Sequence, residues 1–134
     1  MIRVNSIKGE YYHVYNRGVD KRVIFSGHKD YERFLKSLTS FNTLEPIGSI
    51  YEHSFEIKKN NVRDKLLVKI ICYCLNPNHF HLLLTPVINS GVEKFMQRLG
   101  TGYTMYFNEC YKRSGALFQG RYKSKHIIDN NYLL

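Results

Sequence analysis

Two histidines one residue apart, His79 and His81, lie inside the apolar run CLNPNHFHLLL at residues 74–84. Side chains alternate along a strand, so both imidazoles project to one side while Phe80 projects to the other. Two residues advance a strand by about 7 Å, and two imidazoles at that spacing can converge on one divalent cation. A structural pair of histidines that binds no ligand fits the same pattern, and the spacing alone does not separate the two readings.

A structural zinc site is a second interpretation, because Cys72 and Cys74 precede the histidines and would complete a four-ligand set. The geometry depends on the turn about Pro77. With a three-residue loop, Tyr73 faces His81 and the thiols lie on the opposite side of the sheet from the imidazoles. A loop one residue longer reverses this arrangement. A Cys-x-Cys pair also lacks the two-residue spacer that is usual in zinc knuckles.

The elements that would position the histidines follow from periodicity. Alternation predicts a strand at residues 11–18, and helical spacing predicts helices at 30–41 and 90–114. The Asn-Pro-Asn at 76–78 predicts a turn between two strands, and a basic strand is expected within 116–128. This order is typical of a ferredoxin-like α+β fold, with an antiparallel sheet and both helices on one face. We expect one domain, residues 1–134.

The charge of the chain favours a polyanionic partner. Twenty Lys and Arg against 11 Asp and Glu give a net charge of +9 and a pI near 9.5. Such a surplus on a small domain is typical of nucleic-acid binding, although a basic surface without a partner is the simpler alternative. No apolar stretch reaches the roughly 18 residues of a membrane span, and no signal peptide is evident. Three cysteines, an odd number, favour reduced thiols and a cytoplasmic protein.

Basic residues gather at two places that could contact DNA. They follow the first strand and alternate along the last one: Arg17, Lys21, Arg22, Arg121, Lys123 and Lys125. Alternation predicts that the last three share one sheet face, with Tyr122 on the other. Such a row can follow a phosphate backbone. A solvated edge strand protected by lysines would show the same pattern.

Three segments together resemble the single-tyrosine HUH transposases, specifically the IS200-like and REP-associated tyrosine transposases: YYHVYNRGVDKRVIF, CYCLNPNHFHLLL and GTGYTMYFNECYKRSGALFQGRYKS. The resemblance covers residues 11–134 except 42–64, in the family's order. It implies a ferredoxin-like fold in which His79 and His81 bind Mg²⁺ or Mn²⁺. It also implies action on single-stranded DNA, often beside a hairpin. A tyrosine attacks the phosphodiester and leaves a 5′-phosphotyrosine with a free 3′-OH.

The residues are consistent with that chemistry. A bound cation polarises and orients the phosphodiester, which a tyrosine with a pKa near 10 needs in order to attack it. The phenolate is a good enough leaving group for the reaction to be reversed. No ATP is required, in agreement with the absence of a Gly-rich phosphate-binding motif from the sequence.

The nucleophile is the weak point of the resemblance. In the family a final helix carries the tyrosine, with an Asn or Gln one turn later as the third metal ligand. Here that helix would open with DNNYLL, and Tyr132 is the candidate. We expect a truncated relative whose true nucleophile and third ligand fall beyond residue 134. The alternative function is therefore a DNA-hairpin-binding protein without strand cleavage. Relatives with this fold can join edge strands, so a homodimer is also considered.

Overall fold

The computed structural model describes residues 5–44 and 65–128. Six elements alternate as strand, helix, two strands, helix and strand, with a short 3-10 turn after the first strand. Their bounds are β1 Tyr11–Arg17, η1 Val19–Lys21, α1 His28–Ser40, β2 Val68–Asn76, β3 His79–Pro86, α3 Gly91–Tyr111 and β4 Lys123–Ile127. The elements predicted from periodicity are all present.

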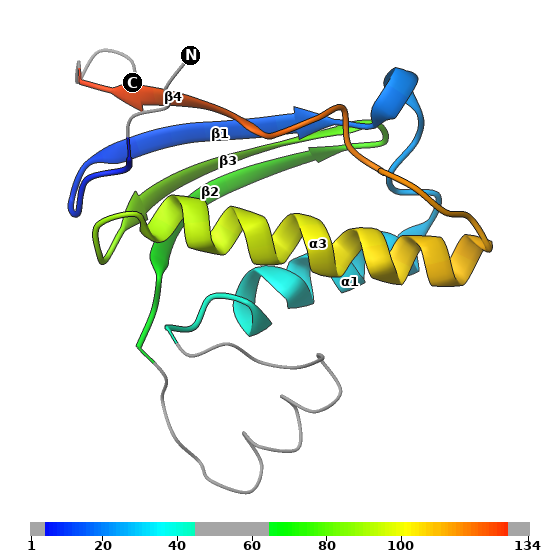
Figure 1. Ribbon diagram of the computed structural model, residues 1–134, viewed down its shortest axis with the longest axis horizontal. Coiled ribbons are helices and arrows are strands. Elements are labelled where there is room, and N and C mark those ends of the chain that lie inside the picture. The colour runs from blue at the N-terminus through cyan, green and yellow to red at the C-terminus, as the bar shows by residue number, and fades with distance from the viewer. Residues whose placement is uncertain (1–4, 45–64, 129–134) are drawn as a thin grey trace, which may run out of the picture.

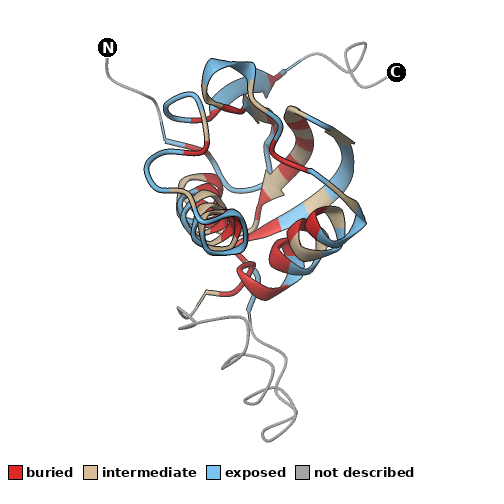
Figure 2. Cartoon of the chain, turned by 90° about the vertical axis from the view of Figure 1, so that its right-hand side faces the viewer, coloured by how far each residue is buried: buried red, intermediate tan, exposed pale blue. Residues whose placement is uncertain are grey.

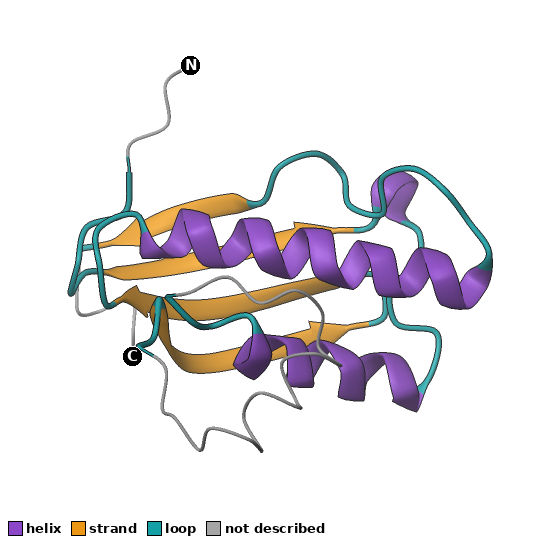
Figure 3. Cartoon of the chain, turned by 60° about the horizontal axis from the view of Figure 1, so that its bottom comes forward, coloured by secondary structure: helices purple, strands orange, loops and turns teal. Residues whose placement is uncertain are grey.

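The four strands form one antiparallel sheet in the order β2-β3-β1-β4. The two central strands, β1 and β3, come from opposite sides of α1 in the sequence. Both helices lie against the same face of the sheet (Figures 1 and 3). This is the predicted ferredoxin-like α+β fold, and the described residues place no helix on the other face. In that same part of the chain, no helix is both long and apolar enough to cross a membrane.

The core lies between the helices and the sheet (Figure 2). Apolar side chains at three- and four-residue spacing turn one stripe of α3 inward: Val92, Phe95, Met96, Leu99, Tyr103 and Phe107. Alternate residues of the central strands meet this stripe, including Val14 of β1 and Phe80 of β3. Tyr103 is fully buried, and its hydroxyl donates to the Ile24 carbonyl oxygen at 2.5 Å. The face of the sheet that carries the histidines is therefore the one that the core does not use.

The β2–β3 turn is shorter than predicted. Asn76 pairs with His79, so the loop holds only two residues, Pro77 and Asn78. The three-residue loop was wrong, and the register shifts by one: Tyr73 faces Leu82, not His81. The turn is held from outside the hairpin, because the Pro77 carbonyl oxygen accepts the backbone N–H groups that follow η1 at 2.8 and 3.1 Å.

Candidate metal and nucleic-acid site

The candidate site lies on the face of the two central strands that the described helices leave uncovered. Three residues of β1 stand directly across from three of β3, in the pairs His13–Leu83, Tyr15–His81 and Arg17–His79. Facing residues share one side of a sheet. The opposite side chains of both strands are buried under the helices. Hydrogen bonding of the two strands thus brings histidine, tyrosine and arginine together at one surface.

His79 is fixed by the turn that precedes it. Its Nδ1 lies 2.7 Å from the Asn78 side-chain oxygen. An amide oxygen only accepts, so His79 Nδ1 carries a hydrogen, and in the neutral ring Nε2 is the nitrogen with the lone pair. Asn78 is itself anchored: its backbone oxygen accepts the Gly18 N–H at 2.9 Å, and its side-chain nitrogen donates to the Lys21 carbonyl oxygen at 3.4 Å.

His81 lies on the same face, as alternation predicted. The two ring centroids are 5.2 Å apart and the rings are nearly perpendicular. The Nδ1 atom of His81 is 2.9 Å from Nε2 of His13, a contact between strands that sequence analysis did not identify. Alternation in YYHVYNR places His13, Tyr15 and Arg17 on one side of their strand. That side could not be matched to the His79 side without the pairing of β1 with β3.

The environment favours neutral imidazoles. Burial lowers the pKa of His81, and the positive charges that His13 and His79 can carry lower it further. Burial also lowers the pKa of His13, and the positive charge of Lys125 adds to the effect. A histidine binds a metal through the lone pair of its neutral form. Both rings therefore stay competent as ligands or hydrogen-bond acceptors to a lower pH than an ordinary histidine.

The structural zinc site is not assembled. The shifted register puts Cys74 across from His81 on this face, and both Cys72 and Cys74 are exposed free thiols. Nevertheless, within 5–44 and 65–128 no three His, Cys, Asp or Glu side chains are placed to hold a metal ion together. What His79 and His81 offer is two imidazole nitrogens. This donor set fits a divalent cation that takes its remaining ligands from water or a bound phosphate.

Lysines border the histidines on the same face. Lys123 of β4 pairs with Tyr15 and Lys125 pairs with His13, so both lysines share the side of the histidine cluster. Both are exposed. Arg17, across from His79, adds a third cationic side chain at the other end. Three of the predicted DNA-contacting residues thus surround the predicted metal ligands.

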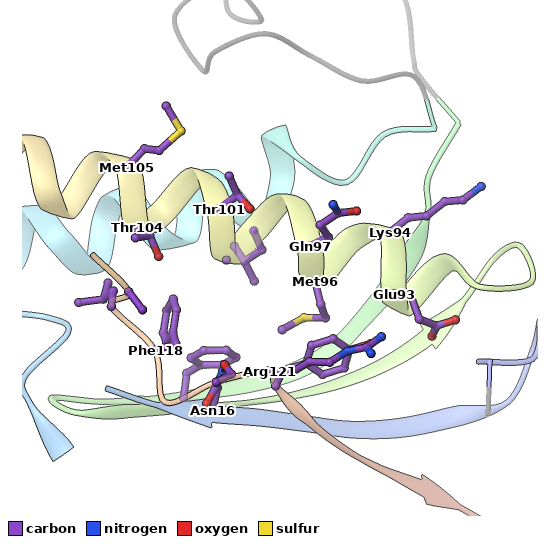
Figure 4. Close-up of a pocket in the computed structure, with 17 residues that line it drawn as sticks. Asn16, Glu93, Lys94, Met96, Gln97, Thr101, Thr104, Met105, Phe118 and Arg121 are labelled. Carbon is purple, nitrogen blue, oxygen red and sulfur yellow. The ribbon is translucent and has the colours of Figure 1, made fainter. Parts of the chain in front are cut away.

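Two other basic residues lie elsewhere. Arg22 stacks its guanidinium over the Phe107 ring at 5.0 Å, on the helix side of the molecule. Arg121 precedes β4, which begins at Lys123, so strand alternation does not govern it. It lines a cavity of about 760 Å³ between α3 and residues 116–122 (Figure 4). The sheet separates this cavity from the histidines, and the predicted row of three basic residues is reduced to two.

Three tyrosines bear on the candidate site. Tyr15 is on the histidine face, and its ring centroid is 5.6 Å from that of His81. Tyr73, expected on that face with a three-residue loop, pairs with Leu82 on the other side and is 52% exposed. Tyr132 lies outside the described residues.

Comparison with known proteins agrees with the sequence motifs. Residues 47–133, more than half of the chain, match the protein-family model described as "Transposase IS200 like". No curated protein sequence matches the chain significantly.

A solved structure of a REP-associated tyrosine transposase bound to a REP hairpin has a similar fold, with a TM-score of 0.58 and 13% sequence identity. The similarity covers 99% of this chain and 65% of that one, so this chain spans about two thirds of the length of its structural neighbour. At this identity the likeness concerns the fold.

Proposed function

The chain belongs to the family of IS200-like transposases, and we propose that it binds single-stranded DNA beside a hairpin and cleaves it through a phosphotyrosine intermediate. The observation that carries the proposal is the placement of His79 and His81 on an open sheet face, bordered by Lys123 and Lys125. Two histidines able to bind a cation, set within a basic surface, are suited to cleavage of a phosphodiester.

His79 and His81 would hold Mg²⁺ or Mn²⁺, and a cation bound there would polarise the scissile phosphate. Two nitrogen ligands suit Mn²⁺ better than Mg²⁺, which prefers oxygen. The lysines of β4 and Arg17 would hold the flanking phosphates by charge. Tyr15, half-buried beside His81, offers a ring on which an unpaired base can stack.

In the cleavage step, a tyrosine hydroxyl oxygen bonds to phosphorus as the bond from phosphorus to the 3′ oxygen breaks. The phenolic proton leaves and the 3′ oxygen gains a proton, so no cofactor is consumed. The reverse attack by a 3′-OH rejoins DNA. Tyr132 is the candidate in this chain.

A second function, binding of hairpin DNA without cleavage, is favoured by one observation. Arg17, Lys123 and Lys125 lie on one face of the sheet, where their charges can hold phosphates whether or not a nucleophile is present. A chain that keeps the basic face but lacks a complete catalytic set would hold DNA and leave it intact.

The two functions are separated by one experiment. The chain is incubated with Mn²⁺ and a library of single-stranded hairpin DNAs labelled at the 3′ end, because a 5′-phosphotyrosine retains the 3′ fragment. A denaturing gel should show a labelled protein adduct that disappears in His79→Ala and Tyr132→Phe and persists in Tyr73→Phe. Salt-sensitive binding without an adduct would establish the second function. Absence of both would refute the proposal.

A further inference from the structure

His13 stands out because its side chain bonds to a predicted metal ligand on another strand. It belongs to β1, where its direct partner across the ladder is Leu83. Its ring instead reaches diagonally to His81, with 2.9 Å between Nε2 of His13 and Nδ1 of His81. The ring centroids are 5.1 Å apart at 28°, so the two rings are also stacked.

We propose that His13 is a positioning residue that fixes the ring orientation and tautomer of His81 for metal binding. The proposal rests on the proposed function to the extent that His81 is a metal ligand. It assigns His13 no contact with metal or DNA.

The tautomer follows from hydrogen counting. A neutral imidazole carries one N–H, and its other nitrogen is the acceptor or ligand. For His81 Nε2 to offer its lone pair to a cation, Nδ1 must hold the hydrogen. That hydrogen then points at Nε2 of His13, which accepts it. With Nδ1 of His81 bonded to His13, Nε2 of His81 is the nitrogen left to bind a cation.

The same arrangement occurs at the other histidine. Asn78 contacts Nδ1 of His79, as His13 contacts Nδ1 of His81. Both ligand rings are therefore held through the same atom, one by the turn and one by the neighbouring strand. Partners of this kind typically contribute 10- to 100-fold to metal affinity, because they orient the ring and select its tautomer.

The test compares His13→Phe with His13→Gln. Phenylalanine keeps a planar ring but removes the acceptor, whereas the glutamine oxygen can replace Nε2 as an acceptor. Mn²⁺ affinity, measured by titration calorimetry without DNA, should fall about 10- to 100-fold in His13→Phe and return to near the wild-type value in His13→Gln. Thermal unfolding of each variant verifies that it is folded.

A second readout reports the tautomer directly. In a long-range ¹H–¹⁵N spectrum of the metal-free protein, His81 should carry its hydrogen on Nδ1 in the wild type and His13→Gln. It should shift towards Nε2–H in His13→Phe.

The outcomes distinguish the two proposals. If His81→Ala binds Mn²⁺ as well as the wild type does, the metal site of the proposed function is refuted, and the role of His13 falls with it. If His81→Ala loses Mn²⁺ while His13→Phe retains wild-type affinity and the wild-type tautomer, only the role of His13 is refuted. A glutamine variant as weak as the phenylalanine variant would likewise overturn it.

Discussion

Asp30 is a fully buried carboxylate that joins the two helices. It accepts hydrogen bonds from the hydroxyls of Tyr106 and Tyr111 on α3, each at 2.7 Å, and from the backbone N–H of Ser26 at 2.7 Å. Burial, followed by the bond to Asp30, raises the pKa of Tyr106. The bond to Asp30 is the main cause that raises the pKa of Tyr111.

These raised pKa values predict a loss of stability at alkaline pH. An unfolded tyrosine loses its proton near pH 10, while folded Tyr106 and Tyr111 keep theirs to higher pH. Above about pH 10 the unfolded state therefore binds fewer protons than the folded state, and the free energy of unfolding falls as pH rises. Below that range both states are neutral at these positions. Urea unfolding of the wild type should show the decline from pH 10 upward.

The double variant Tyr106→Phe/Tyr111→Phe should be less stable at pH 8 but lose less stability between pH 10 and 11. Tyr73→Phe, an exposed tyrosine away from Asp30, is the control and should keep the wild-type slope. Equal slopes in all three proteins would contradict the assignment.

For individual residues, the sequence predicted part of the candidate site. Alternation alone placed His79 and His81 on one face, because the period of a strand is fixed by its backbone. The contact of His13 with His81 could not be predicted, because it depends on which strand pairs with β3 and in what register. The predicted roles of the two histidines as metal ligands stay predictions.

At the scale of elements, the connection after β1 supports the turn that carries His79. Gly18 donates its N–H to the Asn78 carbonyl oxygen at 2.9 Å. A Cβ at Gly18 would lie 2.1 Å from the backbone oxygen of Arg22, far inside van der Waals contact. Glycine is required there by the close approach of two backbone segments.

Gly18→Ala should therefore destabilise the protein by about 1–3 kcal/mol, the usual cost of overpacking, because backbone must move to admit the methyl group. Urea unfolding measures the change. Gly100→Ala is the matched control: a Cβ there meets nothing within 4 Å. In a helix that variant should be neutral or more stable by up to about 1 kcal/mol. Equal stabilities for the two variants would show that the backbone after β1 can move to admit a methyl group without cost, which would contradict the prediction.

The same turn shows where element prediction stops. Pro77 and its two asparagines located the turn, but residue types did not fix its length. The two-residue turn leaves Asn76 and His79 as a ladder pair. Because the loop is one residue shorter than predicted, Cys74 rather than Tyr73 lies opposite His81. A shift of one residue in register moves every side chain of a strand to the other face of the sheet.

At the scale of the whole molecule, the fold could be predicted because each element has its own pattern and the βαββαβ order allows few topologies. The placement of charge was harder to predict. Lys123 and Lys125 reach the histidine face through pairing with β1, whereas Arg121 lies outside the strand and lines the cavity beneath α3. The residue at which β4 begins, Lys123, decides which of these basic residues share the histidine face.

Binding of single-stranded DNA should therefore depend on which lysines are removed. Lys123→Gln/Lys125→Gln should weaken binding and reduce the slope of log affinity against log salt by about 1.4, since each of the two phosphate contacts on a single strand contributes about 0.7. Lys36→Gln/Lys94→Gln removes the same charge from the two helices and should leave the slope near the wild-type value. Fluorescence anisotropy across a salt series measures both. Equal changes in slope for the two double variants would indicate that binding depends on net charge and not on the position of the lysines.

The pairing of the central strands also governs when the site can come into existence. His13 and His81 are 68 residues apart in the chain, and only the β1–β3 ladder brings them together. Closing so long a loop costs chain entropy before any contact compensates for it, which slows folding in proteins of high contact order. A chain emerging from the ribosome can form the β2–β3 hairpin early, with His79 and His81 in place. The contact between His13 and His81 forms only when the first strand docks, so this contact is a late event in folding.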